Sequence, residues 1–323
     1  AHIAPADEPE IAAISGSSAG AMCAVVVADG FEEGGAEGAR TQLRQFWEGV
    51  ARAGESNPYR RTPMMAFLNA FKPGWAQESY LALWADVATR IASPYDFNPL
   101  NINPLRDLIQ RFVDFDAVRA SDLALFISAT NVHTGRLRVF TADKIDVDVV
   151  MASAALPLLF RAVEIDGVPY WDGGYMGNPA IFPFLSTTDS KDVIVVQINP
   201  IARENTPRTS DEIVNRLNEI TFNSTLISEF RTIDFVNRLI DDGHLPNDPG
   251  DSGLHRLNIH RIDLGAFGAR LSAASRLSND YGFFDRLHRA GQRAARRFMD
   301  QHFDKIGVTS SVDLAVEGGV EWA

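Results

Sequence analysis

A Gly-x-Ser-x-Gly sequence near the start of the chain constrains the fold more than any other feature. It occupies residues 16–20 with Ser18 at its centre, and a short apolar run at 11–14 leads into it. Small and apolar residues at 21–28 follow, as expected for a buried helix. A strand, a sharp turn and a helix in this order are the context of a nucleophile elbow. A turn of small residues that only packs a strand on a helix is the alternative interpretation.

In an elbow, Ser18 would point outward from the turn at the N-terminus of the helix. Gly16 and Gly20 would then allow the backbone to turn tightly and let strand and helix approach closely. The free N–H groups at the helix N-terminus, including that of Ala19, could face a developing oxyanion. The motif therefore predicts both a nucleophile and part of its electrostatic environment.

The composition is that of a globular protein, because 46% of the 323 residues are hydrophobic and 22% are charged. The net charge of −12 gives little long-range attraction to nucleic acid or anionic lipid, so we expect no nucleic-acid partner. Any contact with a membrane or micelle surface should be transient, local and apolar. The single cysteine, Cys23, excludes an internal disulfide framework and is compatible with a reducing, cytoplasmic location. We find no apolar run of about 18 residues that would span a membrane.

Hydrophobic periodicity predicts a mixture of strands and helices, which indicates an α/β layered fold. Helices are expected at 39–51, 149–156 and 283–303, and a capping box of Thr209 and Glu212 should open a long helix. Residues 29–38 and 241–253 are expected to be loops. The continuous apolar run at 193–198 is typical of a buried parallel strand. Further strands are expected at 123–130, 136–141, 162–166, 168–171 and 256–264.

A serine hydroxyl is a weak nucleophile unless a base takes its proton, and Asp172 is the best-placed candidate. It ends a predicted hairpin strand, and Gly173 and Gly174 after it permit close backbone approach. Trp171 and Tyr175 could shield its carboxylate from water and raise its proton affinity. The alternative is a turn aspartate that binds its own backbone. Histidines that lie late in the chain could also serve as the base: His244, His255 and His260. His133 falls on a predicted turn and should be exposed.

Two motifs in this order resemble a known family. Residues 16–21 are similar to the Gly-x-Ser-x-Gly-Ala elbow of patatin-like phospholipases, and Asp172-Gly173-Gly174 is similar to their Asp-Gly-Gly motif. The segment 152–160 and the pair Asn178-Pro179 extend the resemblance, which covers roughly residues 11–200. It implies a single domain over 1–323 with a three-layer α/β/α fold and a mainly parallel central sheet. Within it, 53–105 would be a helical cap and 205–323 a helical C-terminal part.

The resemblance also implies an activity: hydrolysis of lipid acyl esters of the phospholipase A or esterase type. Ser18 would be the nucleophile and Asp172 the base of a Ser–Asp dyad, without a histidine, a metal or another cofactor. The substrate would be a phospholipid or another lipid ester. The aromatic-rich segment 53–105 would offer acyl chains an apolar surface, or would instead consist of core helices packed on the sheet.

Other functions stay open at this point. An α/β-hydrolase with a Ser–Asp–His triad would use Ser18, Asp172 and one of the late histidines. A non-catalytic lipid-binding relative is the other alternative, because the family carries a Gly-rich oxyanion loop before its serine and no glycine precedes Gly16 here. The predicted last helix carries a row of basic side chains, which favours either a solvated face or docking to anionic headgroups. They are Arg286, Arg289, Arg293, Arg296 and Arg297.

Overall fold

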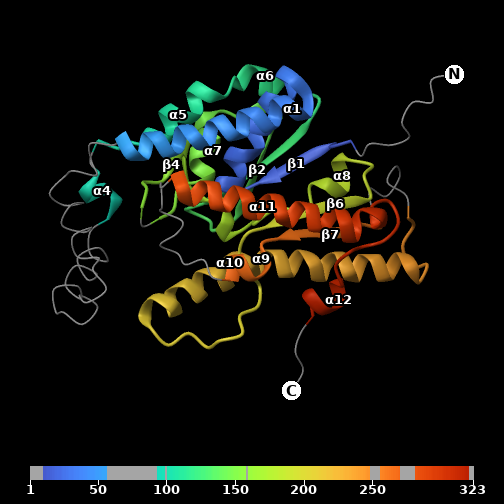
Figure 1. The fold of residues 1–323 in the computed structure, drawn as a ribbon. Helices are drawn as coiled ribbons and strands as arrows, with labels where there is room; N and C mark the ends of the chain where they lie inside the picture. Colours follow the sequence, from blue (N-terminus) through green and yellow to red (C-terminus); the bar gives the residue numbers. More distant parts are fainter. Residues whose placement is uncertain are drawn as a thin grey trace.

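The computed structural model of the protein describes residues 10–56, 93–98, 100–157, 159–247, 255–269 and 281–319. Strands in the middle of the molecule are covered by helices on both sides (Figure 1). Most of the expected cap at 53–105 lies outside the described residues. Within that range, the short helix α4 (Pro94–Phe97) is described, and α5 (Pro104–Phe112) begins at its end.

The larger sheet carries the elbow and is built around one long strand. Its strands are β1 (Ala13–Gly16), β2 (Ala124–Asn131), β3 (Leu137–Thr141), β4 (Val163–Ile165) and β5 (Val168–Asp172). Strand β2 pairs in parallel with β1 and antiparallel with β3 and β5, while β4 pairs antiparallel with β5. Both hairpins predicted from the sequence are therefore confirmed.

The two edges of β2 are used differently, and this difference positions the ends of β1 and β5. One edge pairs with β3 along residues 126–130. The other edge is shared, because β1 pairs with residues 124–127 and β5 with residues 129–131. Since β1 runs parallel to β2 and β5 runs antiparallel, their carboxyl ends approach each other beside Ser128.

The second sheet consists of β6 (Asp192–Gln197) and β7 (Asn258–Asp263), which pair in parallel. The apolar run at 193–198 is confirmed as a parallel strand, but the expected burial holds for one face only. Val193 and Val195 are buried, whereas Ile194 and Val196 are 45% and 71% exposed. The difference arises because, among the described residues, only one face of β6 is packed. Helix α9 (Ser210–Asp241) covers the face that carries Val193 and Val195.

Helices form a layer on each side of the strands, as the sequence predicted for an α/β fold. The first core joins β2 to helices on one side: α1 (Ala19–Ser56), α5, α6 (Phe115–Ala120) and α7 (Val147–Ser153). Helix α11 (Tyr281–His302) packs on α1 through Trp47 and Phe284 and on β7 through Phe298 and His260. The second core joins β6 and β7 to α9 and to α12 (Leu314–Glu317) on the other side.

The remaining short helices are α8 (Phe184–Thr187), which contacts β2 through Phe184 and Phe126, and α10 (Gly265–Ala269). The expected C-terminal part at 205–323 contains α9, α11 and α12, and it also contains strand β7. No helix in the described ranges is both long enough and apolar enough to cross a membrane.

Some element boundaries differ from those predicted from the sequence. The expected loop at 29–38 is too long: α1 consists of two helical parts that meet at a kink, and only Gly34 and Gly35 within this stretch leave helical geometry. Glycine loosens a helix locally, and the apolar residues on both sides still bury one face. Helix α7 begins and ends earlier than the expected 149–156, because the Asp146 side chain caps its N-terminus by accepting from the Val149 amide.

Two other sequence predictions are confirmed at α9 and α11. Thr209 and Glu212 form the predicted capping box at the start of α9. Helix α11 is amphipathic, with Ala290, Ala294 and Phe298 buried. Its five arginines between 286 and 297 are exposed, and docking of this face to anionic headgroups stays a prediction.

Candidate active site

The Gly-x-Ser-x-Gly sequence forms a sharp strand-to-helix turn. Strand β1 ends at Gly16, helix α1 begins at Ala19, and Ser18 between them has a positive φ of 54°. This conformation is uncommon for a residue with a side chain. A Cβ on Gly16 would lie 2.5 Å from the Gly20 carbonyl oxygen, so this position requires glycine. A Cβ on Gly20 would meet nothing within 4 Å, so the expected close approach depends on Gly16 rather than on Gly20.

The end of helix α7 holds the backbone of both Ser18 and Asp172. The Ser18 amide donates to the hydroxyl oxygen of Ser153 at 2.9 Å and to its carbonyl oxygen at 3.2 Å. The Asp172 amide donates to the carbonyl oxygen of Ala155 at 2.9 Å. Two residues that lie far apart in the sequence are thus anchored to Ser153 at the end of α7 and to Ala155, two residues after it.

The strand pairing brings the same two segments together independently. Gly16 lies opposite Ile127, and Asp172 lies opposite Ala129 on the same edge of β2. Positions two residues apart along a strand are separated by roughly 7 Å. The elbow and the turn that follows β5 therefore leave the sheet side by side.

Asp172 is fully buried at the end of β5, and its surroundings explain the two glycines that follow it. Its Oδ1 accepts from the Gly174 amide at 2.7 Å, and its carbonyl oxygen accepts from the Thr130 hydroxyl at 2.8 Å. A Cβ on Gly173 would lie 2.0 Å from the Ser128 carbonyl oxygen, so only glycine fits there. The hydrogen bond from the Gly174 amide is the contact expected of an aspartate that binds its own turn. That role alone does not require the Asp172 side chain to be fully buried.

A side chain of α9 covers the Asp-Gly-Gly turn. A Cβ on Gly174 would lie 2.3 Å from the ring of Phe222, and this ring packs on Tyr175 with centroids 5.2 Å apart. Sequence reasoning missed Phe222, and it included Ser153 only as a member of the segment 152–160 without a role, because each contacts the site from a distant part of the chain. The sequence predicted α9 through its capping box, which gave no signal for Phe222.

The histidines considered as alternative bases are engaged elsewhere or exposed. His255 is buried and its Nε2 lies 3.0 Å from the Ser190 carbonyl oxygen. His260 is also buried, and its Nε2 lies 2.9 Å from Oδ1 of Asp192 in the second sheet. His244 is exposed beyond the end of α9, and His133 is exposed on its turn. In the described ranges, no His, Cys, Asp and Glu side chains gather in a group that could hold a metal ion.

A family model described as patatin-like phospholipase matches residues 5–185, which is more than half of the chain. The chain belongs to the patatin-like phospholipase family. No curated protein matches the chain significantly. The patatin-like match includes both the elbow and the Asp-Gly-Gly turn, and it agrees with the mixed α/β architecture. Membership of this patatin-like family connects the chain in general with lipid acyl hydrolases.

Proposed function

We propose that the protein hydrolyses carboxylic esters of lipids, such as phospholipids, with Ser18 as nucleophile and Asp172 as base. The observation that carries this proposal is the shared anchoring of the two residues: the Ser18 amide donates to Ser153 at the end of α7, and the Asp172 amide donates to Ala155 two residues later. The convergence of β1 and β5 on one edge of β2 supports the same pairing.

In the proposed reaction, Asp172 accepts the hydroxyl proton of Ser18 while the serine oxygen attacks the ester carbonyl. The electron pair of the carbonyl bond moves to the oxygen, and the resulting tetrahedral intermediate expels the alcohol, which takes the proton from Asp172. Water then attacks the acyl-enzyme with Asp172 again as base, and the fatty acid and free Ser18 are released.

The start of α1 supplies part of the electrostatic stabilisation. The first N–H groups of a helix have no intrahelical acceptor, and the helix dipole is positive at this end. The position of Ala19 at the start of α1, directly after Ser18, supports its amide as an oxyanion donor in this proposal. The Ser18 amide is already used by Ser153, so it is not a donor to the oxyanion.

The arrangement favours a dyad over a Ser–Asp–His triad. The buried imidazoles of His255 and His260 bind Ser190 and Asp192, and both bonds lie at the start of β6. Ser18 and Asp172 lie instead at the carboxyl ends of β1 and β5. A triad that used His255 or His260 would require that imidazole to leave a buried hydrogen bond.

Labelling with a fluorophosphonate probe tests the proposal, because the probe reacts with an activated serine. We expect the wild-type chain to be labelled and Ser18→Ala to be unlabelled, with both folded by circular dichroism. A folded wild-type chain that takes no label and hydrolyses no chromogenic ester would contradict the proposal. It would favour a non-catalytic lipid-binding relative.

A further inference from the structure

A long-range hydrogen bond joins the elbow to the segment after the Asp-Gly-Gly turn. The hydroxyl of Ser17 donates to Oδ1 of Asn178 at 3.0 Å, across 161 positions of sequence. Ser17 directly precedes Ser18 and is only 7% exposed. Neither side chain takes part in the proposed chemistry, so the bond needs another explanation.

Asn178 also binds helix α9 through its other polar atoms. Its Nδ2 donates to the Phe222 carbonyl oxygen at 3.0 Å, and its backbone amide donates to the Thr225 hydroxyl at 3.2 Å. A side-chain amide offers an acceptor and donors at once, which neither a carboxylate nor an aliphatic side chain can do. Asn178 therefore connects the elbow, the Asp-Gly-Gly turn and α9.

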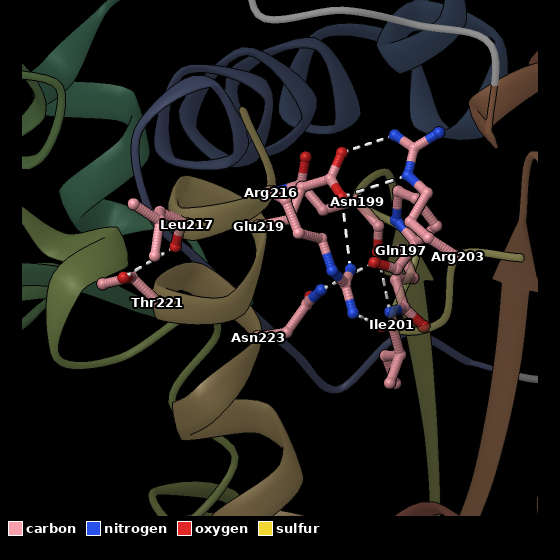
Figure 2. Close-up of polar contacts among 10 residues, drawn as sticks. Gln197, Asn199, Ile201, Arg203, Arg216, Leu217, Glu219, Thr221 and Asn223 are labelled. Carbon is pink, nitrogen blue, oxygen red and sulfur yellow. Dashed lines mark hydrogen bonds and ion pairs between the residues drawn. The ribbon is translucent and has the colours of Figure 1, made fainter. Parts of the chain in front are cut away.

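The turn of α9 next to Asn178 is itself fixed from its other side. Figure 2 shows Glu219 with the guanidinium groups of Arg203 and Arg216, where Nε of Arg203 lies 3.1 Å from the carboxylate. One turn later, Nδ2 of Asn223 donates to the Pro200 carbonyl oxygen at 2.9 Å. Because these contacts fix α9, the hydrogen bonds of Asn178 connect the elbow to a part of the helix that is itself held in place.

We propose that Asn178 is a positioning residue, which sets the Ser18 hydroxyl relative to Asp172 by fixing the side chain of Ser17. The inference rests on the proposed function, because it assumes that Ser18 reacts. Misplacing a reacting group by about 1 Å can lower a rate by about a hundredfold. Loss of this bond should therefore lower turnover more than it lowers substrate binding.

Ser17→Thr and Ser17→Val provide a matched pair, because the two side chains have similar shapes and only threonine keeps the hydroxyl. With a soluble chromogenic ester, Ser17→Val should lose about tenfold to a hundredfold in kcat with KM within about twofold. Ser17→Thr should stay within about threefold of the wild type. The rate of fluorophosphonate labelling should follow kcat in both variants.

Asn178→Ala should reproduce the loss, and the double variant with Ser17→Val should lose no more than the worse single variant. Thr221→Val is the control, since the exposed Thr221 hydroxyl only donates to the Leu217 carbonyl within α9, and it should keep wild-type kcat (Figure 2). Should Asn178→Ala fail to fold, the pair at Ser17 decides alone.

Equal kcat in Ser17→Thr and Ser17→Val would overturn the role of Asn178 while a labelled wild type keeps the proposed function. A wild-type chain that the probe does not label would instead overturn the proposed function and this role with it.

Discussion

Ser153 binds the backbone amide of Ser18 twice, through its hydroxyl oxygen at 2.9 Å and its carbonyl oxygen at 3.2 Å. Ser153 is fully buried at the end of α7, so its bonds to the elbow are shielded from water. They hold Ser18 at its positive φ, a conformation that costs free energy outside such a support. The fold thus stabilises a backbone conformation that the serine alone would not adopt.

The first prediction concerns the glycine after Asp172. Gly173→Ala should destabilise the protein by about 1–3 kcal/mol or prevent folding, because the new Cβ would lie 2.0 Å from the Ser128 carbonyl oxygen. Urea denaturation measures the change. Gly291→Ala in α11 is the control, since a Cβ there meets nothing within 4 Å, and it should stabilise by about 0.5–1 kcal/mol. A Gly173→Ala variant as stable as the wild type would show that the turn is looser than described.

The second prediction concerns the ion pairs of α9. Burial alone would raise the pKa of Glu219, but Arg203 and Arg216 lower it overall. Glu219→Gln should therefore destabilise the protein by about 1–3 kcal/mol, whereas Glu48→Gln at an exposed pair on α1 should change stability by less than about 0.5 kcal/mol. Chemical denaturation of both variants gives the comparison. Equal changes in the free energy of unfolding would mean that the ion pairs of Glu219 stabilise the protein no more than the surface pair of Glu48.

The third prediction is a pH dependence that involves Glu229. Burial raises the pKa of this carboxyl, although the amides of Ile181 and Phe182 oppose the shift. The folded protein then holds the proton more tightly than the unfolded chain. The contribution of Glu229 to stability is complete below its unfolded pKa of about 4.3, and it is lost as the pH rises through the folded pKa.

Glu229→Gln removes this pH-dependent loss of stability, because glutamine does not ionise. The variant can still accept the hydrogen bond from the Ile181 amide through its side-chain oxygen. Its melting temperature should therefore exceed that of the wild type at pH 7 and approach it near pH 4. Glu212→Gln is the opposite control, because the amides of Arg208 and Thr209 lower the pKa of Glu212, so the variant should be less stable at pH 7. A Glu229→Gln variant that melts below the wild type at pH 7 would contradict the assigned direction.

The fourth prediction concerns the only cysteine. Desolvation raises the pKa of Cys23 to about 11, and a hydrogen bond with Trp47 only partly offsets this. Roughly one thiol in a few thousand is then ionised at pH 7.5, and the thiolate is the reactive form. A disulfide reagent should modify the folded protein slowly and the urea-unfolded protein at once. Rapid modification of the folded chain would place Cys23 in a more accessible position.

Local patterns in the sequence predicted the elements that carry the site. The elbow, both hairpins, the Thr209–Glu212 capping box and the amphipathic helix α11 each follow from residues close together in the chain. The glycines at 29–38 indicated an interruption, but not that it would be limited to Gly34 and Gly35 between two helical parts of α1, because glycine is typical of a loop as much as of an interrupted helix. The exposed face of β6 was also missed, since an apolar run does not say which neighbours will cover it.

The contacts that assemble the site are not local. Ser17 and Asn178 are 161 positions apart, and Phe222 reaches the Asp-Gly-Gly turn from a helix that begins after β6. Hydrophobic periodicity describes which face of an element is buried, but it does not identify the partner on that face. From the sequence, Asn178 could therefore be interpreted only as a turn residue, although its side chain connects three parts of the fold.

The most direct test of the account measures hydrolysis of a chromogenic ester by folded variants of the proposed nucleophile and of three candidate bases. Asp172→Asn and Ser18→Ala should lose nearly all turnover, while His255→Gln and His260→Gln should keep kcat within about tenfold, because those imidazoles bind Ser190 and Asp192. Near wild-type turnover in Asp172→Asn, together with loss of activity in either histidine variant, would contradict the dyad of Ser18 and Asp172.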